Sequence, residues 1–111
     1  MLVALADVYV QIPQREQARE LMLAVQQAAR AEQGCISYAF AETLDDPGHF
    51  IAVQQWRDEA ALEEHYRSQA FADYQARISE NLVRSSELRV LSAQETYTPF
   101  ESPSIEPQST D

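Results

Sequence analysis

Apolar side chains occupy both alternating sets of positions in residues 2–11, so neither face of this segment is polar. Leu2 and Val8 belong to one set, and Val3 and Leu5 belong to the other. The pattern predicts a strand that is covered on both faces. A single small domain seldom has enough helix to cover both faces of its own sheet. One face of the predicted sheet therefore needs a partner from outside the chain.

A helical repeat of apolar residues follows this strand, and residues with known end preferences flank it. Pro13 favours the first turn of a helix, where its fixed backbone angle is already correct. Gly34 is placed to end the helix in a left-handed conformation. The residues between them that recur at helical spacing predict the buried stripe: Ala18, Leu21, Met22, Val25 and Ala29.

The second half of the chain reads as a hairpin, two short helices and a final strand. The turn residues 45–48 separate predicted strands over 35–43 and 49–57. Asp58 and Ser68 are good helix caps. The predicted elements that follow are helices over 59–66 and 69–83 and a strand over 87–95.

The resulting element order is β-α-β-β-α-β, which predicts an α+β fold of the ferredoxin-like, split βαβ type over residues 1–97. Such a fold is a four-stranded antiparallel sheet with helices on one face. A second copy of the same sheet is the simplest cover for the other face, so we expect a homodimer. Residues 98–111 hold three prolines among polar residues and predict a disordered or extended C-terminal tail.

Composition narrows the classes of partner. The net charge is −10, from 18 acidic and 8 basic residues, which disfavours binding to nucleic acid or to an anionic membrane. No apolar run approaches the length of a membrane helix. Cys35 is the single cysteine, which excludes an intrachain disulfide and favours a reducing compartment. The N-terminal segment lacks the basic start of a secretory signal, so we expect a cytoplasmic protein.

The sequence offers no pattern for a metal ion or a nucleotide cofactor. His49 and His65 lie far apart in the chain and lack the spacing of metal ligands. Gly34 and Gly48 are the only glycines, which excludes a glycine-rich phosphate loop. We therefore expect neither a metal nor a cofactor.

Four segments, in their order and spacing, resemble the antibiotic biosynthesis monooxygenase (ABM) family, especially its small quinol-monooxygenase-like members. The resemblance covers about residues 2–96 and is carried by Glu32-Gln33-Gly34-Cys35 with Tyr38, Gln55-Trp56, Ala61-Leu62-Glu63-Glu64-His65 and Ser68-Gln69-Ala70-Phe71. It implies a dimeric α+β barrel with a cavity between helices and sheet in each subunit. Family members include oxygenases that oxidise phenolic or quinol-like substrates without metal or flavin.

The chain departs from the family pattern at three places. Gln55 stands where many members have Glu, and segment 68–71 lacks the His that many members carry there. Tyr74 and Gln75 stand where the resemblance to haem-degrading relatives requires a His, which disfavours haem breakdown.

Cofactor-free oxygenation requires a base that removes a phenolic proton and a dry apolar cavity that holds the anion beside oxygen. His65 is the candidate base, because imidazole titrates near neutral pH. Asp7, inside the apolar strand, is the second candidate catalytic residue: if it is buried, it can act as a base or orient His65, and a position at the sheet edge or at the rim of the barrel explains it equally well. Core packing also explains the aromatic residues that we nominate as walls for a flat substrate: Trp56, Tyr38, Tyr66, Phe71 and Tyr74.

The sequence thus predicts a cofactor-independent monooxygenase that oxidises a quinol-like or polyphenolic aromatic small molecule with O2. Two alternatives stay open at this stage. One is a non-catalytic dimer that binds a small molecule, and the other is an isomerase of a small metabolite on the same scaffold.

Overall fold

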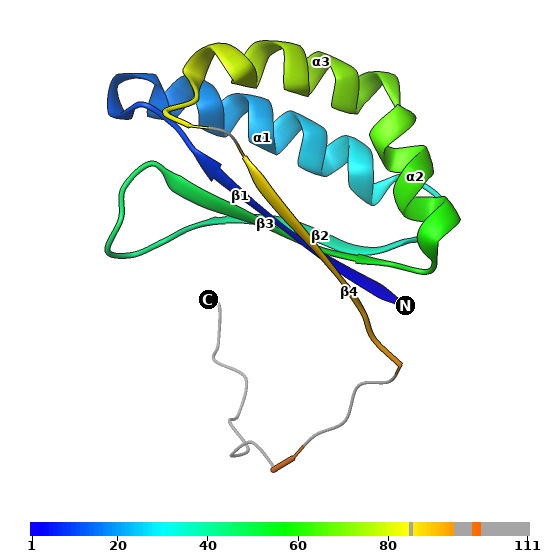
Figure 1. Cartoon of the computed structure of the whole chain (residues 1–111). Coiled ribbons are helices and arrows are strands. Elements are labelled where there is room, and N and C mark those ends of the chain that lie inside the picture. The colour runs from blue at the N-terminus through cyan, green and yellow to red at the C-terminus, as the bar shows by residue number, and fades with distance from the viewer. Residues whose placement is uncertain (85, 95–98, 101–111) are drawn as a thin grey trace, which may run out of the picture.

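The computed structural model describes residues 1–84, 86–94 and 99–100. Its four strands form one antiparallel sheet in the order β2-β3-β1-β4, with the helices on one face (Figure 1). The elements are β1 (Leu2–Tyr9), α1 (Arg15–Arg30), β2 (Cys35–Glu42), β3 (His49–Trp56), α2 (Glu59–Arg67), α3 (Gln69–Ile78) and β4 (Glu87–Ser92), with 3-10 turns η1 (Ile12–Gln14) and η2 (Ser79–Asn81). The α+β, ferredoxin-like prediction is confirmed.

Four predicted boundaries are wrong by two to five residues. The final strand, predicted over 87–95, ends at Ser92. Helix α1 ends at Arg30, so Gly34 lies in the turn beyond the helix and does not end it.

The start of α1 and the end of the second predicted helix also differ from the prediction. Pro13 lies in η1, so α1 begins two residues later, at Arg15. The helix predicted over 69–83 ends at Ile78. Beyond it the chain is held against the end of β1, because Val83 N–H donates to the Tyr9 carbonyl at 2.8 Å. Tertiary hydrogen bonds therefore override the helical pattern at this point.

The predicted caps of the two short helices are confirmed. The Asp58 carboxylate accepts a hydrogen bond from Ala61 N–H at 2.9 Å at the start of α2. The Ser68 hydroxyl accepts from Phe71 N–H at 3.2 Å at the start of α3. Ser68 also ends α2, and its extended backbone makes the chain turn between the two helices. This turn brings aromatic residues of both helices to the same side of the sheet.

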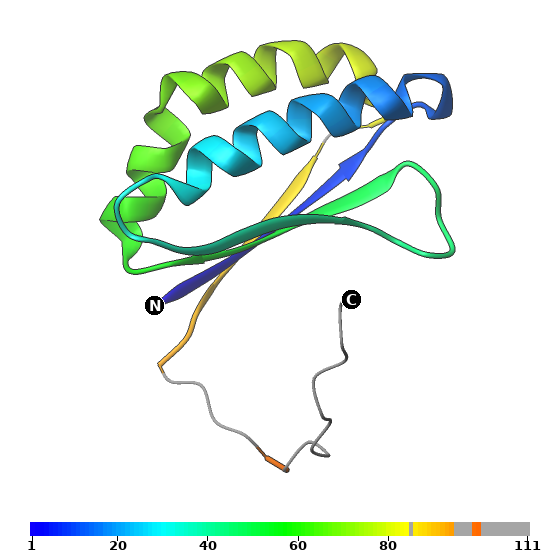
Figure 2. The ribbon, with the colours of Figure 1, turned by 180° about the vertical axis from the view of Figure 1, so that it is seen from behind.

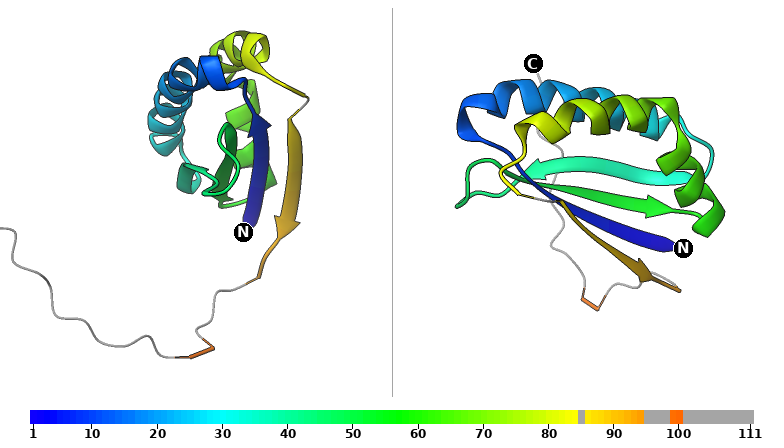
Figure 3. Two further views of the ribbon diagram at one scale, coloured as in Figure 1. Left: turned by 90° about the vertical axis from the view of Figure 1, so that its left-hand side faces the viewer. Right: turned by 45° about the horizontal axis from the view of Figure 1, so that its top comes forward.

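The helices cover most of the sheet but not β4. Figure 2 shows α1 running above β2, and α1 buries Ala18, Met22 and Val25 against the sheet. Every residue of β4 is exposed. Figure 3 shows β4 as the outermost strand beyond β1, away from α1. The helix-covered side is therefore open along this edge.

The sheet face opposite the helices is largely apolar. Because side chains alternate along a strand, the residues between the buried ones point to this face. Val3 and Leu5 of β1 are paired with Leu91 of β4 and Val53 of β3, respectively. Val53 is 43% exposed and Leu91 is 54% exposed. This apolar surface, which we call the open face, is uncovered in a single chain.

Two further predictions concern the C-terminal tail and the lack of a membrane-spanning helix. The expected tail over 98–111 lies outside the described residues except for positions 99–100, so it stays a prediction. Among the helices in the described part of the chain, none is both long enough and apolar enough to cross a membrane.

Gly34 connects α1 to β2 at a point where no side chain fits. Its φ is +86°, and a Cβ atom there would lie 2.6 Å from the Ala61 Cβ of α2. We predict that Gly34→Ala lowers the free energy of unfolding by roughly 2–4 kcal/mol, because left-handed backbone strain and crowding add together. Urea unfolding measures this change. The neighbouring, exposed Gln33→Ala serves as the control, and equal stability of the two variants would contradict the prediction.

Candidate active site

A cavity of about 600 Å³ lies between the helix-covered face of the sheet and helices α2 and α3. Its floor is formed by small side chains at the centre of the sheet. Ala6 of β1 and Ala52 of β3 are cross-strand partners, so two adjacent positions lack bulk at the same point. Ser86, Glu87 and Leu88 line it at the side of β4. The cavity therefore lies next to the sheet edge that the helices leave uncovered.

Four of the five aromatic residues nominated from the sequence line this cavity. Tyr38 comes from β2, Tyr66 from α2, and Phe71 and Tyr74 from α3. The Phe71 ring lies 4.8 Å from that of Tyr66 and 5.9 Å from that of Tyr74. The walls are thus a continuous aromatic surface, which is the shape that a flat ring system requires. Their role in substrate binding stays a prediction.

The tyrosines add polar atoms to this aromatic wall. Burial raises the pKa of Tyr38 and of Tyr74 well above the usual range, so both hydroxyl groups stay protonated at any ordinary pH. The buried hydroxyl groups of Tyr66 and Tyr74 have no hydrogen-bond partner among the described residues. Burying a hydroxyl group without a hydrogen bond costs free energy, so a ligand or a water molecule commonly binds to such a group.

His65 is fully buried behind this wall and is paired with Glu32. Its Nδ1 lies 3.1 Å from both carboxylate oxygens of Glu32, so Nδ1 carries the proton and donates it. Burial lowers the pKa of His65, although the Glu32 carboxylate opposes this effect. The ring is therefore neutral near pH 7, and its Nε2 lone pair is free to accept a proton. Nε2 has no partner within the described part of the chain.

His65 does not itself line the cavity. Its ring centre lies 5.1 Å from that of Tyr66, 5.2 Å from that of Phe71 and 5.3 Å from that of Tyr38. These three rings separate the imidazole from the cavity space. A proton can pass from the cavity to Nε2 only if one of these aromatic side chains moves.

Trp56, the fifth nominated aromatic residue, packs in the core and does not line the cavity. It is 0% exposed, and its ring centre lies 4.8 Å from that of His65. Its indole N–H donates to the Gln54 side-chain oxygen at 3.0 Å. Gln54 itself lines the cavity, as Tyr66 does. Trp56 thus orients a cavity residue.

Asp7 lies on the open face, on the other side of the sheet from His65. Its carboxylate oxygens contact His49 Nε2 at 2.8 Å and Arg89 Nη2 at 3.3 Å. The strand alternation that sends Ala6 and Val8 into the helix-covered side sends Asp7 the opposite way. One role predicted for Asp7 was to orient His65, but the two residues lie on opposite faces of the sheet.

Sequence reasoning gave no role to Glu32 or Gln54, although each carried a signal. Glu32 follows the end of α1, where the helix dipole disfavours a carboxylate. Gln54 is the polar member of an inward-facing set on β3 that otherwise reads Phe50, Ala52 and Trp56. A polar residue placed against a local preference indicates that a specific partner compensates for it.

Within the described residues, no group of three or more His, Cys, Asp or Glu side chains is arranged to hold a metal ion. Cys35 is half-buried, and its burial, with a further contribution from nearby Glu32, raises the thiol pKa. It is therefore a thiol rather than a reactive thiolate.

The chain is similar to several known proteins, both in sequence and in fold. Of curated sequences, "Putative monooxygenase Rv0793" of Mycobacterium tuberculosis is 35% identical over 77 residues, which covers 69% of this chain and 75% of that protein. "Uncharacterized protein sll1783" of Synechocystis is 27% identical over 97 residues, and the chain spans 66% of that protein's length. The solved structure of Rv0793 superimposes with a TM-score of 0.81 at 29% identity, covering 87% of this chain and 98% of that one.

The family model described as antibiotic biosynthesis monooxygenase matches residues 1–77, which include β1, α1, the β2–β3 hairpin, α2 and most of α3. Three of the four cavity-lining aromatic residues named above lie on α2 and α3 within this range. The relative from Mycobacterium tuberculosis and a further relative from Bacillus subtilis are both named as putative monooxygenases. With its ferredoxin-like sheet and its aromatic cavity, the chain belongs to the antibiotic biosynthesis monooxygenase family.

Proposed function

We propose that this protein is a cofactor-independent monooxygenase that oxidises a quinol-like or polyphenolic aromatic molecule with O2. The proposal rests on the aromatic cavity and on the neutral His65 imidazole that lies behind its wall, hydrogen-bonded to Glu32. A planar aromatic substrate fits between rings, and the unpaired hydroxyl groups of Tyr66 and Tyr74 can hydrogen-bond to its oxygen atoms.

The reaction of an anthrone-type substrate balances without an external reductant. The ring methylene loses two hydrogen atoms and gains one oxygen atom as a carbonyl. The second oxygen atom of O2 leaves as water, so the substrate supplies all four electrons. Removal of a phenolic or enolic proton gives the electron-rich anion that transfers the first electron to O2. The protein therefore has to supply a base and a cavity that excludes water.

In this proposal His65 is the base and Glu32 positions it. The Glu32 carboxylate holds the Nδ1–H tautomer, which directs the lone pair to Nε2. Glu32 also stabilises the imidazolium that forms when Nε2 takes the proton. Movement of Tyr66 or Phe71 on substrate binding opens the path between the cavity and Nε2. Contacts in an unliganded site commonly tighten only when the substrate is bound.

The proposal includes a homodimer formed through the open face. Val53 and Leu91 expose apolar area there that a second sheet would bury. The Asp7 carboxylate on this face is already paired, since it contacts His49 and Arg89. Paired charges lose less free energy on burial than single ones. A two-fold arrangement of identical faces is the simplest way to cover this surface.

Oxygen uptake tests the proposed reaction directly. We expect the protein to consume O2 with hydroquinones or anthrone-type compounds, at a rate above the uncatalysed oxidation of the same compound. A protein that binds such compounds, observed as quenching of Trp56 fluorescence, without consuming oxygen would be the non-catalytic binding dimer. That result would contradict the proposed reaction.

A further inference from the structure

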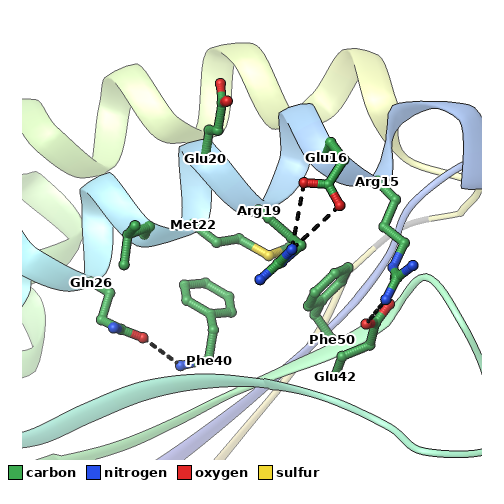
Figure 4. Close-up of a pocket in the computed structure, with 10 residues that line it drawn as sticks. Arg15, Glu16, Arg19, Glu20, Met22, Gln26, Phe40, Glu42 and Phe50 are labelled. Atoms are coloured by element: carbon green, nitrogen blue, oxygen red, sulfur yellow. Dashed lines mark hydrogen bonds and ion pairs between the residues drawn. The ribbon is translucent and has the colours of Figure 1, made fainter.

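A second hollow, of about 560 Å³, lies between α1 and the β2–β3 hairpin, on the same helix-covered face of the sheet. Its floor is apolar and consists of Met22, Phe40 and Phe50 (Figure 4). Met22 and Phe50 are buried, at 2% and 4% exposure. Its upper side is formed by charged and polar residues of α1. The hollow therefore combines an apolar surface with a charged rim.

This hollow is distinct from the candidate active site. Among the described residues, Phe40 is the one side chain that lines both spaces. On the active-site side its ring lies 5.8 Å from that of Tyr38 and 6.1 Å from that of Tyr74. Its backbone N–H is held by the Gln26 side-chain oxygen at 2.8 Å, which ties α1 to β2 at this point. The Phe40 ring is thus a wall between two separate hollows.

Arg15, at one end of the hollow, is bound to Glu42 by two hydrogen bonds. Arg15 donates from Nε to one oxygen of Glu42 at 2.7 Å and from Nη2 to the other at 2.5 Å. Glu42 also accepts from Gly48 N–H at 3.0 Å. This two-bond arrangement lowers the pKa of Glu42, which stays ionised. The Arg15–Glu42 pair therefore links α1 to β2 at one end of the hollow, and Arg15 is not the residue that we expect to bind a ligand.

Arg19 is different, because most of its donors are free. Only Nη1 is engaged, with the two Glu16 oxygens at 3.3 and 3.4 Å, and no partner of Nε or Nη2 lies within the described residues. The Arg19 and Glu16 side chains are 58% and 78% exposed, so this ion pair is weak. Figure 4 shows the Arg19 side chain extending from α1 toward the space between the rings of Phe40 and Phe50.

We propose that this hollow is a second ligand site, which binds a small aromatic carboxylate. The carboxylate takes the free Nε and Nη2 edge of Arg19, which matches its two oxygens as a fork. The aromatic body lies on Met22, Phe40 and Phe50. Three carboxylates line the hollow: in Figure 4 that of Glu20 points away from these rings, and those of Glu16 and Glu42 are bound by Arg19 Nη1 and by Arg15.

The two methionines of the chain make a local test possible. Met1 and Met22 are the only ones, so protein labelled with ¹³C on the methionine methyl groups gives two signals, and Met22 reports on the floor of the hollow. We expect 2-naphthoate to shift the Met22 signal saturably through the ring current of the naphthalene. The titration is run near 0.15 M salt, where screening over about 8 Å limits repulsion from distant carboxylates.

Two comparisons decide the role of Arg19. Arg19→Gln should weaken 2-naphthoate binding by roughly tenfold or more, the scale of a lost charged hydrogen bond. Arg67→Gln, on the exposed side of α2, is the matched control and should change nothing. Neutral 2-naphthamide lacks the carboxylate that Arg19 binds. Its affinity for the wild-type protein should therefore be no higher than the affinity of 2-naphthoate for Arg19→Gln. An unshifted Met22 signal, equal binding by Arg19→Gln, or stronger binding of 2-naphthylmethylammonium would overturn the proposal.

Discussion

Replacement of His65 by asparagine should lower kcat on an accepted quinol or anthrone by about a hundredfold or more, the usual scale for loss of a general base. The asparagine amide can still donate to Glu32, so this partly buried carboxylate keeps a partner and the fold is retained. Steady-state oxygen uptake measures kcat, and circular dichroism checks the fold. His49→Gln is the matched control, because His49 lies on the open face beside Asp7.

The pH profile gives an independent readout of the same assignment. Only the neutral imidazole accepts a proton, so activity should fall as the pH decreases through the pKa of His65. Burial lowers this pKa, so the fall should lie below the ordinary histidine value of about 6.5. Glu32→Gln removes the carboxylate that favours the charged ring and should move the fall to still lower pH. Full activity of His65→Asn would exclude His65 as the base.

Substitution of Val53 by aspartate should convert a dimer to a monomer at micromolar concentration. Val53 lies on the open face, where the two-fold axis of a homodimer would place the new charge in the interface twice. Burial of an unpaired carboxylate costs several kcal/mol per site. Sedimentation should give a mass near twice 12.6 kDa for the wild-type protein and near 12.6 kDa for the variant.

Leu44→Asp is the matched control for this experiment. Leu44, like Val53, is an exposed aliphatic residue. It lies after the end of β2, away from the open face, and is 103% exposed, so the same charge there should leave the mass unchanged. A wild-type protein that sediments as a monomer would contradict the homodimer. So would a Val53→Asp variant that remains dimeric.

The fold was predictable because its determinants are local. Asp58 and Ser68 accept the backbone hydrogen bonds expected of caps, and Gly34 adopts a positive φ, although it does so in the turn before β2 and not at the end of α1. The errors arise where distant parts of the chain meet. The end of α3 is set by the hydrogen bond between Val83 and Tyr9, and no helical periodicity encodes that contact.

The candidate site was predictable in part, for a related reason. Helical spacing places Phe71 and Tyr74 on one face of α3, and both line the cavity. The partner of His65 was not predictable from spacing, because Glu32 lies 33 residues earlier in the chain and meets it only in the folded protein. Asp7 was assigned by its unusual position in an apolar strand, which does not indicate the face of the sheet to which the side chain points.

Oxidation of an anthrone-type compound under ¹⁸O₂ tests the proposed monooxygenase reaction most directly. We expect one ¹⁸O atom in the new carbonyl of the product, the second in water, and a roughly hundredfold slower incorporation by His65→Asn than by wild type. Product formed at the uncatalysed rate, or hydrogen peroxide in place of labelled product, would contradict it.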